Sequence, residues 1–80
     1  MSRTAEEKTQ DYTAMGDSKD LINDIVAGNR DSTLDAAERQ DMVDRNVEHL
    51  ELMVALDDWG SEDMTAINSA ITSGKGYTAS

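Results

Sequence analysis

The sequence has no cysteine, no proline and no phenylalanine among its 80 residues. Without cysteine, neither a disulfide framework nor a thiolate zinc site can stabilise the fold. No apolar run approaches the roughly 18 residues that a membrane span requires, so we expect no contact with a membrane. Basic residues are also scarce, since 7 Lys and Arg oppose 17 Asp and Glu and leave a formal net charge of -10. This charge disfavours direct binding to nucleic acid and predicts partners that are neutral or basic proteins.

Length and apolar content predict one small domain with polar ends. Eighty residues make room for a single domain at most. Leu, Ile and Val together number 13, and all of them lie between Leu21 and Ile71. We therefore expect a polar arm over residues 1–16, a three-helix body over residues 17–76 and a loose tail over residues 77–80. The arm is expected to be a frayed terminus, a segment that becomes ordered on a partner, or a short helix.

The first expected helix is short and amphipathic. It begins near Asp17 or Ser18, whose side chains can cap exposed backbone N–H groups, and it ends at Gly28, which suits a left-handed C-terminal residue. Its apolar residues share one narrow face: Leu21, Ile22, Ile25 and Val26. A helix with one apolar face needs a neighbour that covers it.

The second expected helix is the longest element, and it runs from Ser32 or Thr33 to about Trp59, before the helix-breaking Gly60. Its seam follows a 4-3-4-3-4 spacing that predicts packing against another helix. The seam consists of Ala36, Gln40, Val43, Val47, Leu50 and Val54. Between Leu50 and Leu56, apolar residues occupy almost every direction around the axis. This surplus predicts either a tight hairpin with the other helices on both sides or a contact with a second chain.

The third expected helix follows the turn at Gly60, with Ser61 as its N-cap, and it ends at Gly74 or Gly76. Its apolar stripe consists of Met64, Ile67 and Ile71. We expect this stripe to pack against the end of the second helix and form a helical hairpin. The predicted fold class is therefore all-α, with a flexible or extended N-terminal arm.

The far side of the second helix carries acidic residues only. Five acids recur there at spacings of three and four residues, and we call them the acidic face: Glu38, Asp41, Asp44, Glu48 and Glu51. Their separation along the helix axis is about 5 Å, which is comparable to the spacing of nucleic-acid phosphates. We therefore expect the acidic face to meet either water or a basic protein.

Residues that carry catalytic or metal-binding chemistry are few. His49 is the only histidine, and neither a two-histidine zinc spacing nor a Ser-His-Asp order surrounds it. Four acids lie around the turn at Trp59: Asp57, Asp58, Glu62 and Asp63. A solvated acidic turn is favoured over a weak cation site. The sequence therefore predicts no enzymatic activity, no cofactor and no metal centre.

Residues 45–80 contain three consecutive features that carry a resemblance. These are the helix sequence NVEHLELMVALDDW, the run SEDMTAINSAI and a Gly-Lys-Gly-Tyr tail. Together they resemble the C-terminal part of small, largely uncharacterised proteins encoded by tailed bacteriophages. The resemblance implies a viral origin and brings no catalytic motif with it.

The expected function is that of a non-enzymatic structural protein of the virion. It would be a decoration or minor capsid-associated protein that docks on other phage structural proteins of the capsid or tail. Its contacts are expected from the end of the second helix and from both arms: Leu52, Met53, Leu56, Trp59, Tyr12, Met15 and Tyr77. The alternative is a small inhibitor or adaptor in the host cytoplasm, whose acidic face imitates nucleic acid when it binds a host protein. Self-association through the same apolar residues is equally compatible with the pattern.

Overall fold

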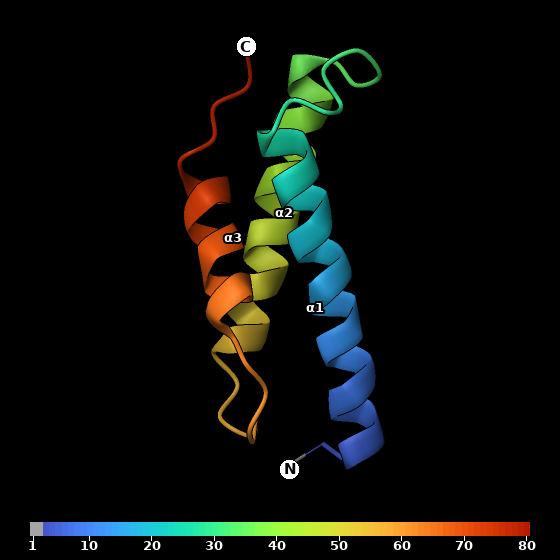
Figure 1. Ribbon diagram of the computed structural model, residues 1–80, viewed down its shortest axis with the longest axis vertical. Helices are drawn as coiled ribbons and strands as arrows, with labels where there is room; N and C mark the ends of the chain where they lie inside the picture. Colours follow the sequence, from blue (N-terminus) through green and yellow to red (C-terminus); the bar gives the residue numbers. More distant parts are fainter. Residues whose placement is uncertain (1–2) are drawn as a thin grey trace.

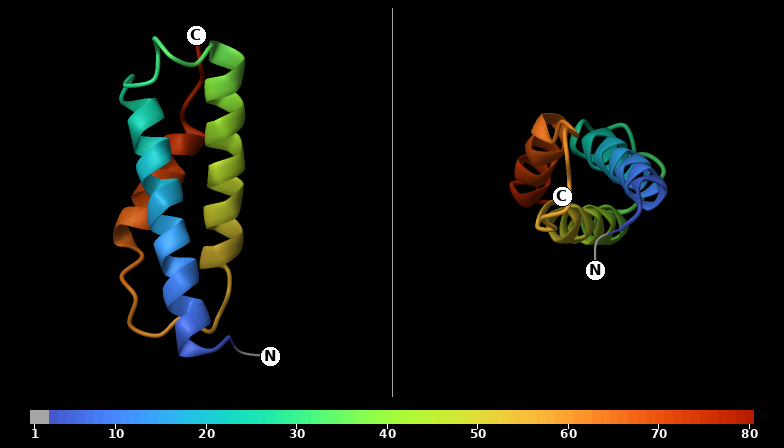
Figure 2. Two further views of the ribbon diagram at one scale, coloured as in Figure 1. Left: turned by 90° about the vertical axis from the view of Figure 1, so that its right-hand side faces the viewer. Right: turned by 90° about the horizontal axis from the view of Figure 1, so that it is seen from below.

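The computed structural model describes residues 3–80 and contains three helices, α1 (Ala5–Val26), α2 (Ala36–Val54) and α3 (Thr65–Lys75). Helices α1 and α3 run in one direction and α2 runs in the other (Figure 1). Viewed along the bundle, the three helices surround a common axis, and each packs against the other two (Figure 2). The bundle measures 41 × 19 × 18 Å, and residues 3–80 include no strand. The predicted all-α class is confirmed, and none of these helices is long and apolar enough to cross a membrane.

The predicted polar arm and short first helix are wrong, because α1 has 22 residues and already begins at Ala5. A capping box starts it: the Thr4 side chain accepts the N–H of Glu7, and the Glu7 carboxylate accepts the N–H of Thr4. Farther along, Met15 is fully buried and fixes this half of the helix to the core. Residues 1 and 2 of the expected arm lie outside the described residues.

The predicted end of the first helix at Gly28 is confirmed within two residues. Helix α1 ends at Val26, and Gly28 follows with a φ of 89°, a left-handed conformation that glycine adopts without strain. Asp24 then accepts hydrogen bonds from Asn29 and Arg30 across this turn. These bonds hold the pKa of Asp24 below its usual value, with the Arg30 side chain as the largest cause.

Helix α2 is shorter than predicted at both ends. Its N-cap is Asp35, which forms a second capping box with Glu38. It ends at Val54, whereas the sequence pattern predicts a helix to about Trp59. The indole N–H of Trp59 donates a 2.7 Å hydrogen bond to the Met53 carbonyl, which is one of the oxygens that a helix end leaves without an intrahelical partner. Trp59 therefore folds back over the end of α2 and cannot extend it.

Helix α3 begins after Met64 and not at Ser61 as predicted. The carboxylate of Asp63 accepts the N–H of Thr65 at 2.9 Å and satisfies one donor of the first turn. Gly74 lies inside the helix, and a Cβ atom at this position would overlap the side chain of Val47 on α2. The absence of that atom permits a close approach of α3 to α2.

The core draws on all three helices. Its buried apolar members are Met15, Ile22, Ile25, Val43, Val47, Leu50, Ile67 and Ala70. The seam predicted for the second helix therefore supplies Val43, Val47 and Leu50 to the core, as expected. Each large apolar side chain contributes about 1.5–3 kcal/mol to the free energy of folding when it is fully buried. The hydrophobic stabilisation of the bundle therefore depends on this small set of residues.

Candidate functional site

The loop over residues 55–64 lies at the same end of the bundle as the start of α1 (Figure 1). Arg3 fastens the loop: its backbone N–H and its guanidinium donate to the Asp58 carboxylate at 3.1, 3.0 and 2.5 Å. The same guanidinium donates to Asp11 at 2.6 Å, and Lys8 Nζ donates to the Asp58 carbonyl at 2.9 Å. Arg3 and Lys8 therefore hold a loop residue that is 55 and 50 positions away from them in the sequence.

We call the contacts of Arg3 with Asp58 and Asp11 the Arg3 clamp. Its opposite charges stabilise one another. The Arg3 side chain, followed by its backbone N–H, holds the pKa of Asp58 well below its usual range. Conversely, the hydrogen bonds that the Arg3 guanidinium donates to Asp58 and Asp11 raise the pKa of Arg3 above its usual value. In the same loop, the backbone N–H of Thr65 lowers the pKa of Asp63. These shifts favour the charged forms of Arg3 and Asp58, which are the forms that bind each other.

Trp59 is enclosed by residues of its own chain. The guanidinium carbon of Arg3 lies 4.2 Å from the ring centroid, in cation–π geometry. Tyr12 meets the indole edge-on, with a centroid distance of 6.2 Å and an interplanar angle of 63°. The Tyr12 hydroxyl also donates to the Asp63 carbonyl at 2.7 Å. Trp59 and Tyr12, both expected at a partner interface, are thus brought together inside the molecule and are half-buried there.

The other predicted interface residues are dispersed. Met15 belongs to the core and has no exposed surface, while Met53 is partly buried against that core. Tyr77 lies at the opposite end of the bundle, where its hydroxyl accepts a 3.0 Å hydrogen bond from Arg39. The sequence therefore grouped residues that the fold separates.

Two predicted interface residues do remain on the surface. Leu52 is 63% exposed and Leu56 is 42% exposed, and with Val26 they are the exposed large apolar residues among residues 3–80. They lie four positions apart, at the end of α2 and just beyond it, and we call the pair the leucine patch. The apolar surplus predicted for this stretch is therefore real, and α1 and α3 leave this part of it uncovered.

The acidic face lies on the outer side of α2, and all five of its residues are exposed. Two of them have ion-pair partners: Asp41 contacts Arg45 at 3.0 Å, and Glu51 contacts Lys75 at 2.8 Å. Asp44 accepts a hydrogen bond from Gln40 at 3.0 Å. The negative charge of this face is consequently only partly compensated, and it continues along α2 to the edge of the leucine patch.

Three of the four acids around Trp59 have structural partners, and Asp57 is exposed. Asp58 binds Arg3, Glu62 accepts the N–H of Gly60 at 2.8 Å, and Asp63 accepts the N–H of Thr65. Among residues 3–80 there is no group of three or more His, Cys, Asp or Glu side chains placed to hold a metal ion. The predicted acidic turn is thus an organised loop whose carboxylates bind backbone N–H groups and one arginine.

His49 makes one contact that sequence reasoning missed. Its Nδ1 atom lies 2.9 Å from the hydroxyl of Ser18, which is buried on α1. The pair joins α1 to α2 and satisfies a polar group within the core. Sequence analysis assigned Ser18 to a helix start, so its place one turn after Met15 on the buried stripe was not recognised.

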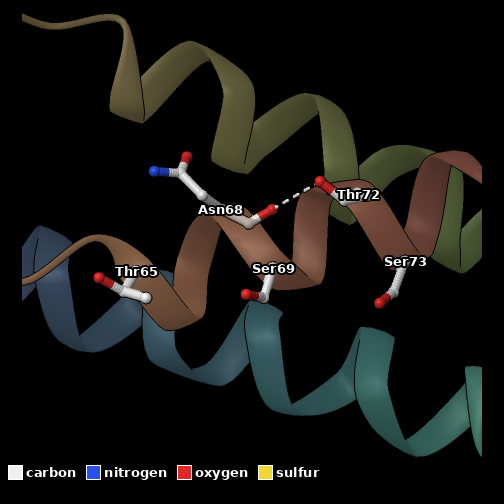
Figure 3. Close-up of a pocket in the computed structure, with 5 residues that line it drawn as sticks. All are labelled: Thr65, Asn68, Ser69, Thr72 and Ser73. Atoms are coloured by element: carbon white, nitrogen blue, oxygen red, sulfur yellow. Dashed lines mark hydrogen bonds between the residues drawn. The ribbon is translucent and has the colours of Figure 1, made fainter.

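A shallow hollow on α3 is lined by small uncharged side chains (Figure 3). Thr65, Ser69 and Ser73 form one row along the helix, and Asn68 and Thr72 form the adjacent row. The Thr72 hydroxyl donates to the Asn68 carbonyl at 3.1 Å. No charged side chain lines this hollow, which separates it from the strongly acidic surface of α2.

The leucine patch, the acidic residues beside it and the clamped loop are therefore the best-defined candidate site of the described chain. Its exposed apolar side chains suit contact with another protein, because large apolar groups gain free energy when they leave water. Neither a protein-family model, nor a curated protein, nor a solved structure matches this chain.

Proposed function

We propose that this protein is a non-enzymatic structural protein that docks on a larger protein assembly through the leucine patch. In keeping with the resemblance of residues 45–80 to tailed-phage proteins, the assembly is a phage particle. The protein is then a small decoration or minor capsid-associated component, located in the virion, with capsid or tail proteins as partners.

The observation that carries this proposal is the exposure of Leu52 and Leu56 beside a loop that is firmly held. Leu52 and Leu56 are 63% and 42% exposed, so burying the exposed part of each contributes roughly 0.6–2 kcal/mol. The Arg3 clamp fixes the loop that follows Leu56, so little conformational entropy is lost when a partner binds there. A pre-organised apolar patch of this kind suits stable docking better than catalysis.

The surroundings of the patch define the partner surface. Glu48, Glu51 and Asp57 are exposed near the two leucines in the sequence. We expect the partner to offer an apolar recess with basic residues at its rim. Opposite charges favour the correct orientation of the two proteins, and acidic surfaces of other proteins are repelled.

A second candidate is an inhibitor or adaptor that binds a basic groove of a host protein in the host cytoplasm. The exposure of all five acids along α2 favours it, since a basic groove can reach every carboxylate of the acidic face. Such a complex is mainly electrostatic, so its affinity falls steeply as the salt concentration rises.

Recovery of complexes at two salt concentrations distinguishes the two functions. The tagged protein is purified from phage-infected cells at low and at high salt, and the chains that accompany it are identified and quantified by mass spectrometry. Docking through the leucine patch predicts capsid or tail proteins in a fixed ratio that salt does not change. Recovery of one host protein that is lost at high salt would contradict it and support the inhibitor.

A matched pair of acidic variants completes this experiment. Asp44→Asn removes one charge from the acidic face two turns before Leu52, whereas Asp20→Asn removes one exposed charge from α1. If the inhibitor function is correct, only the first substitution weakens the host complex. If docking through the leucine patch is correct, both variants retain their particle proteins.

A further inference from the structure

The buried core of the bundle stops short of the end that carries the loop over residues 55–64. Towards that end, the last buried apolar residues of the three helices are Met15, Leu50 and Ile67. Beyond them, residues 3–14 and 51–66 contain no buried residue. A part of a protein with few buried apolar contacts opens at a lower cost in free energy than the core does. This end of the bundle is therefore the part that can open while the rest stays folded.

At this end, residues 3–14 and the loop lie side by side, and we call these two segments the latch (Figure 2). Three side chains of the first segment bind main-chain or side-chain oxygen atoms of the second: Arg3, Lys8 and Tyr12. Two of them also enclose the ring of Trp59, which packs against the core. Each segment of the latch thus depends on the other for its contacts.

The ion pair of the latch makes the opening of one segment alone unfavourable. The side chains of Arg3 and Asp58 are only 17% and 15% exposed. A charge in such a place that loses its partner is costly, unless the segment that carries it moves into water as well. Once one segment has detached, the other therefore loses much of what keeps it closed.

We infer that the two segments of the latch open and close together as one unit while the rest of the bundle stays folded. Trp59 is covered by Arg3 and Tyr12 in the closed form and is exposed in the open form. The unit ends on α1 at Met15, whose fully buried side chain keeps the following part of the helix on the core. The latch is thus a conformational device that exposes the one tryptophan of the chain without unfolding the bundle.

Opening of the latch changes the apolar surface beside the leucine patch. In the closed form, the Met53 carbonyl accepts both the indole N–H of Trp59 and the backbone N–H of Leu56, so both residues lie at the end of α2. The open form adds a free aromatic ring to this place. An effect on docking rests on the function proposed above, whereas the coupled opening of the latch does not.

Hydrogen exchange, followed by NMR in the isolated 80-residue chain, tests the coupling. The indole N–H of Trp59 gives a single signal that reports on the loop, because it is bonded to the Met53 carbonyl in the closed form. The backbone amides of residues 9–13, inside the first turns of α1, report on the other segment. Exchange is measured under conditions in which its rate follows the opening equilibrium.

The two capping boxes of the protein provide a matched pair of variants. Thr4→Ala removes the N-cap hydroxyl of α1, which bonds to Glu7 and not to the loop. Asp35→Ala removes the N-cap carboxylate of α2 at the opposite end of the bundle. Both positions are exposed, so neither substitution disturbs the core.

Coupled opening predicts that Thr4→Ala speeds the exchange of the α1 amides and of the indole N–H by the same factor. The factor is at least about twofold, as expected for the loss of a helix cap. Asp35→Ala leaves both rates unchanged, because it lies outside the latch. No partner is present in this experiment, so a failure of docking on particles leaves its result untouched.

Three results would overturn the inference. Faster exchange of the α1 amides with an unchanged indole rate shows that the start of α1 frays alone. Unchanged rates in both places show that the start of α1 does not control the loop. Faster exchange in both places with Asp35→Ala as well shows that Trp59 is exposed only when the whole bundle unfolds.

Discussion

The guanidinium of Arg3 lies 4.2 Å from the centroid of the Trp59 ring while it also binds Asp58, the residue that precedes this tryptophan. A residue before the first helix thus fixes the loop between the second and third helices. Leu56 of the leucine patch lies near the start of this loop. Arg3 therefore stabilises the loop beside the leucine patch, although Arg3 is not part of the patch.

Replacing Arg3 by alanine is expected to loosen the loop and leave the bundle folded. The substitution removes the cation from the Trp59 ring and the partner of Asp58. We predict a red shift of the tryptophan fluorescence, faster amide exchange over residues 55–64 and unchanged helical circular dichroism. Arg45→Ala, which breaks an exposed ion pair on α2, is the control and leaves the fluorescence unchanged. Identical spectra for both variants would show that Arg3 does not hold the loop.

Asp58 is expected to make stability depend on pH in the acidic range. Because Arg3 lowers its pKa in the folded state, the unfolded chain binds a proton there more readily than the native chain does. The contribution of the pair is complete above the ordinary aspartate value of 3.8, and it is lost as the pH falls towards the lowered value.

Urea unfolding of the wild type and Asp58→Asn at several pH values measures this contribution. The wild type should be the more stable protein at pH 6, and the difference should shrink between about pH 5 and about pH 2. The lowered pKa values of Asp24 and Asp63 act in both proteins and therefore cancel in the comparison. A difference that stays constant with pH would rule out the ion pair as its source.

Met15→Ala tests whether the N-terminal half of α1 belongs to the cooperative fold. Met15 is fully buried, so truncating its side chain should cost about 2–5 kcal/mol in the free energy of unfolding. Thr13→Ala, exposed on the same helix, should change it by less than about 0.5 kcal/mol. Chemical denaturation of both variants gives the values. A negligible effect of Met15→Ala would restore the polar arm that the composition predicts.

The long first helix was predictable only in part. Thr4 and Glu7 have the spacing of a capping box, and this local signal was available in the sequence. The low apolar content of the first 20 residues concealed it, because Met15 alone does not define a stripe. Its buried neighbour on that stripe is Ser18, whose hydroxyl is acceptable in the core only because His49 binds it from α2. Such a tertiary contact cannot be deduced from hydrophobic periodicity.

Two glycine substitutions are expected to have effects of opposite sign. Gly74→Ala places a Cβ atom against Val47, and overpacking of this kind costs about 1–3 kcal/mol. Gly16→Ala meets no atom within 4 Å in the middle of α1, so it should gain about 0.5–1 kcal/mol from the better helix propensity of alanine. Thermal or urea unfolding measures both. Stabilisation by both substitutions would contradict the close approach of α3 to α2.

The candidate site, like the first helix, was predictable only in part. The all-round apolar character of residues 50–56 correctly indicated surplus surface, because three helices cannot enclose every side of α2. It did not indicate that Trp59 covers the end of α2, since that arrangement depends on Arg3 and Tyr12 in distant sequence. Nor did it identify Arg39, a charged residue that is only 8% exposed and that binds residues 77–80.

The central claim is that the leucine patch docks the protein on a phage particle, and the measurement that tests it most directly is the incorporation of tagged variants into purified particles. The double substitution Leu52→Ser and Leu56→Ser removes the patch. The control is Val26→Ser, which alters a 37% exposed apolar residue at the last position of α1, at the opposite end of the bundle.

All three positions are partly exposed and lie outside the buried core, so unfolding measurements should first confirm that each variant is folded under the conditions of the experiment. Docking through the patch predicts that incorporation of the double variant falls at least about tenfold, since about 1.4 kcal/mol of lost burial is sufficient, and that Val26→Ser is incorporated like the wild type. Incorporation of the folded double variant at the wild-type level would contradict the claim.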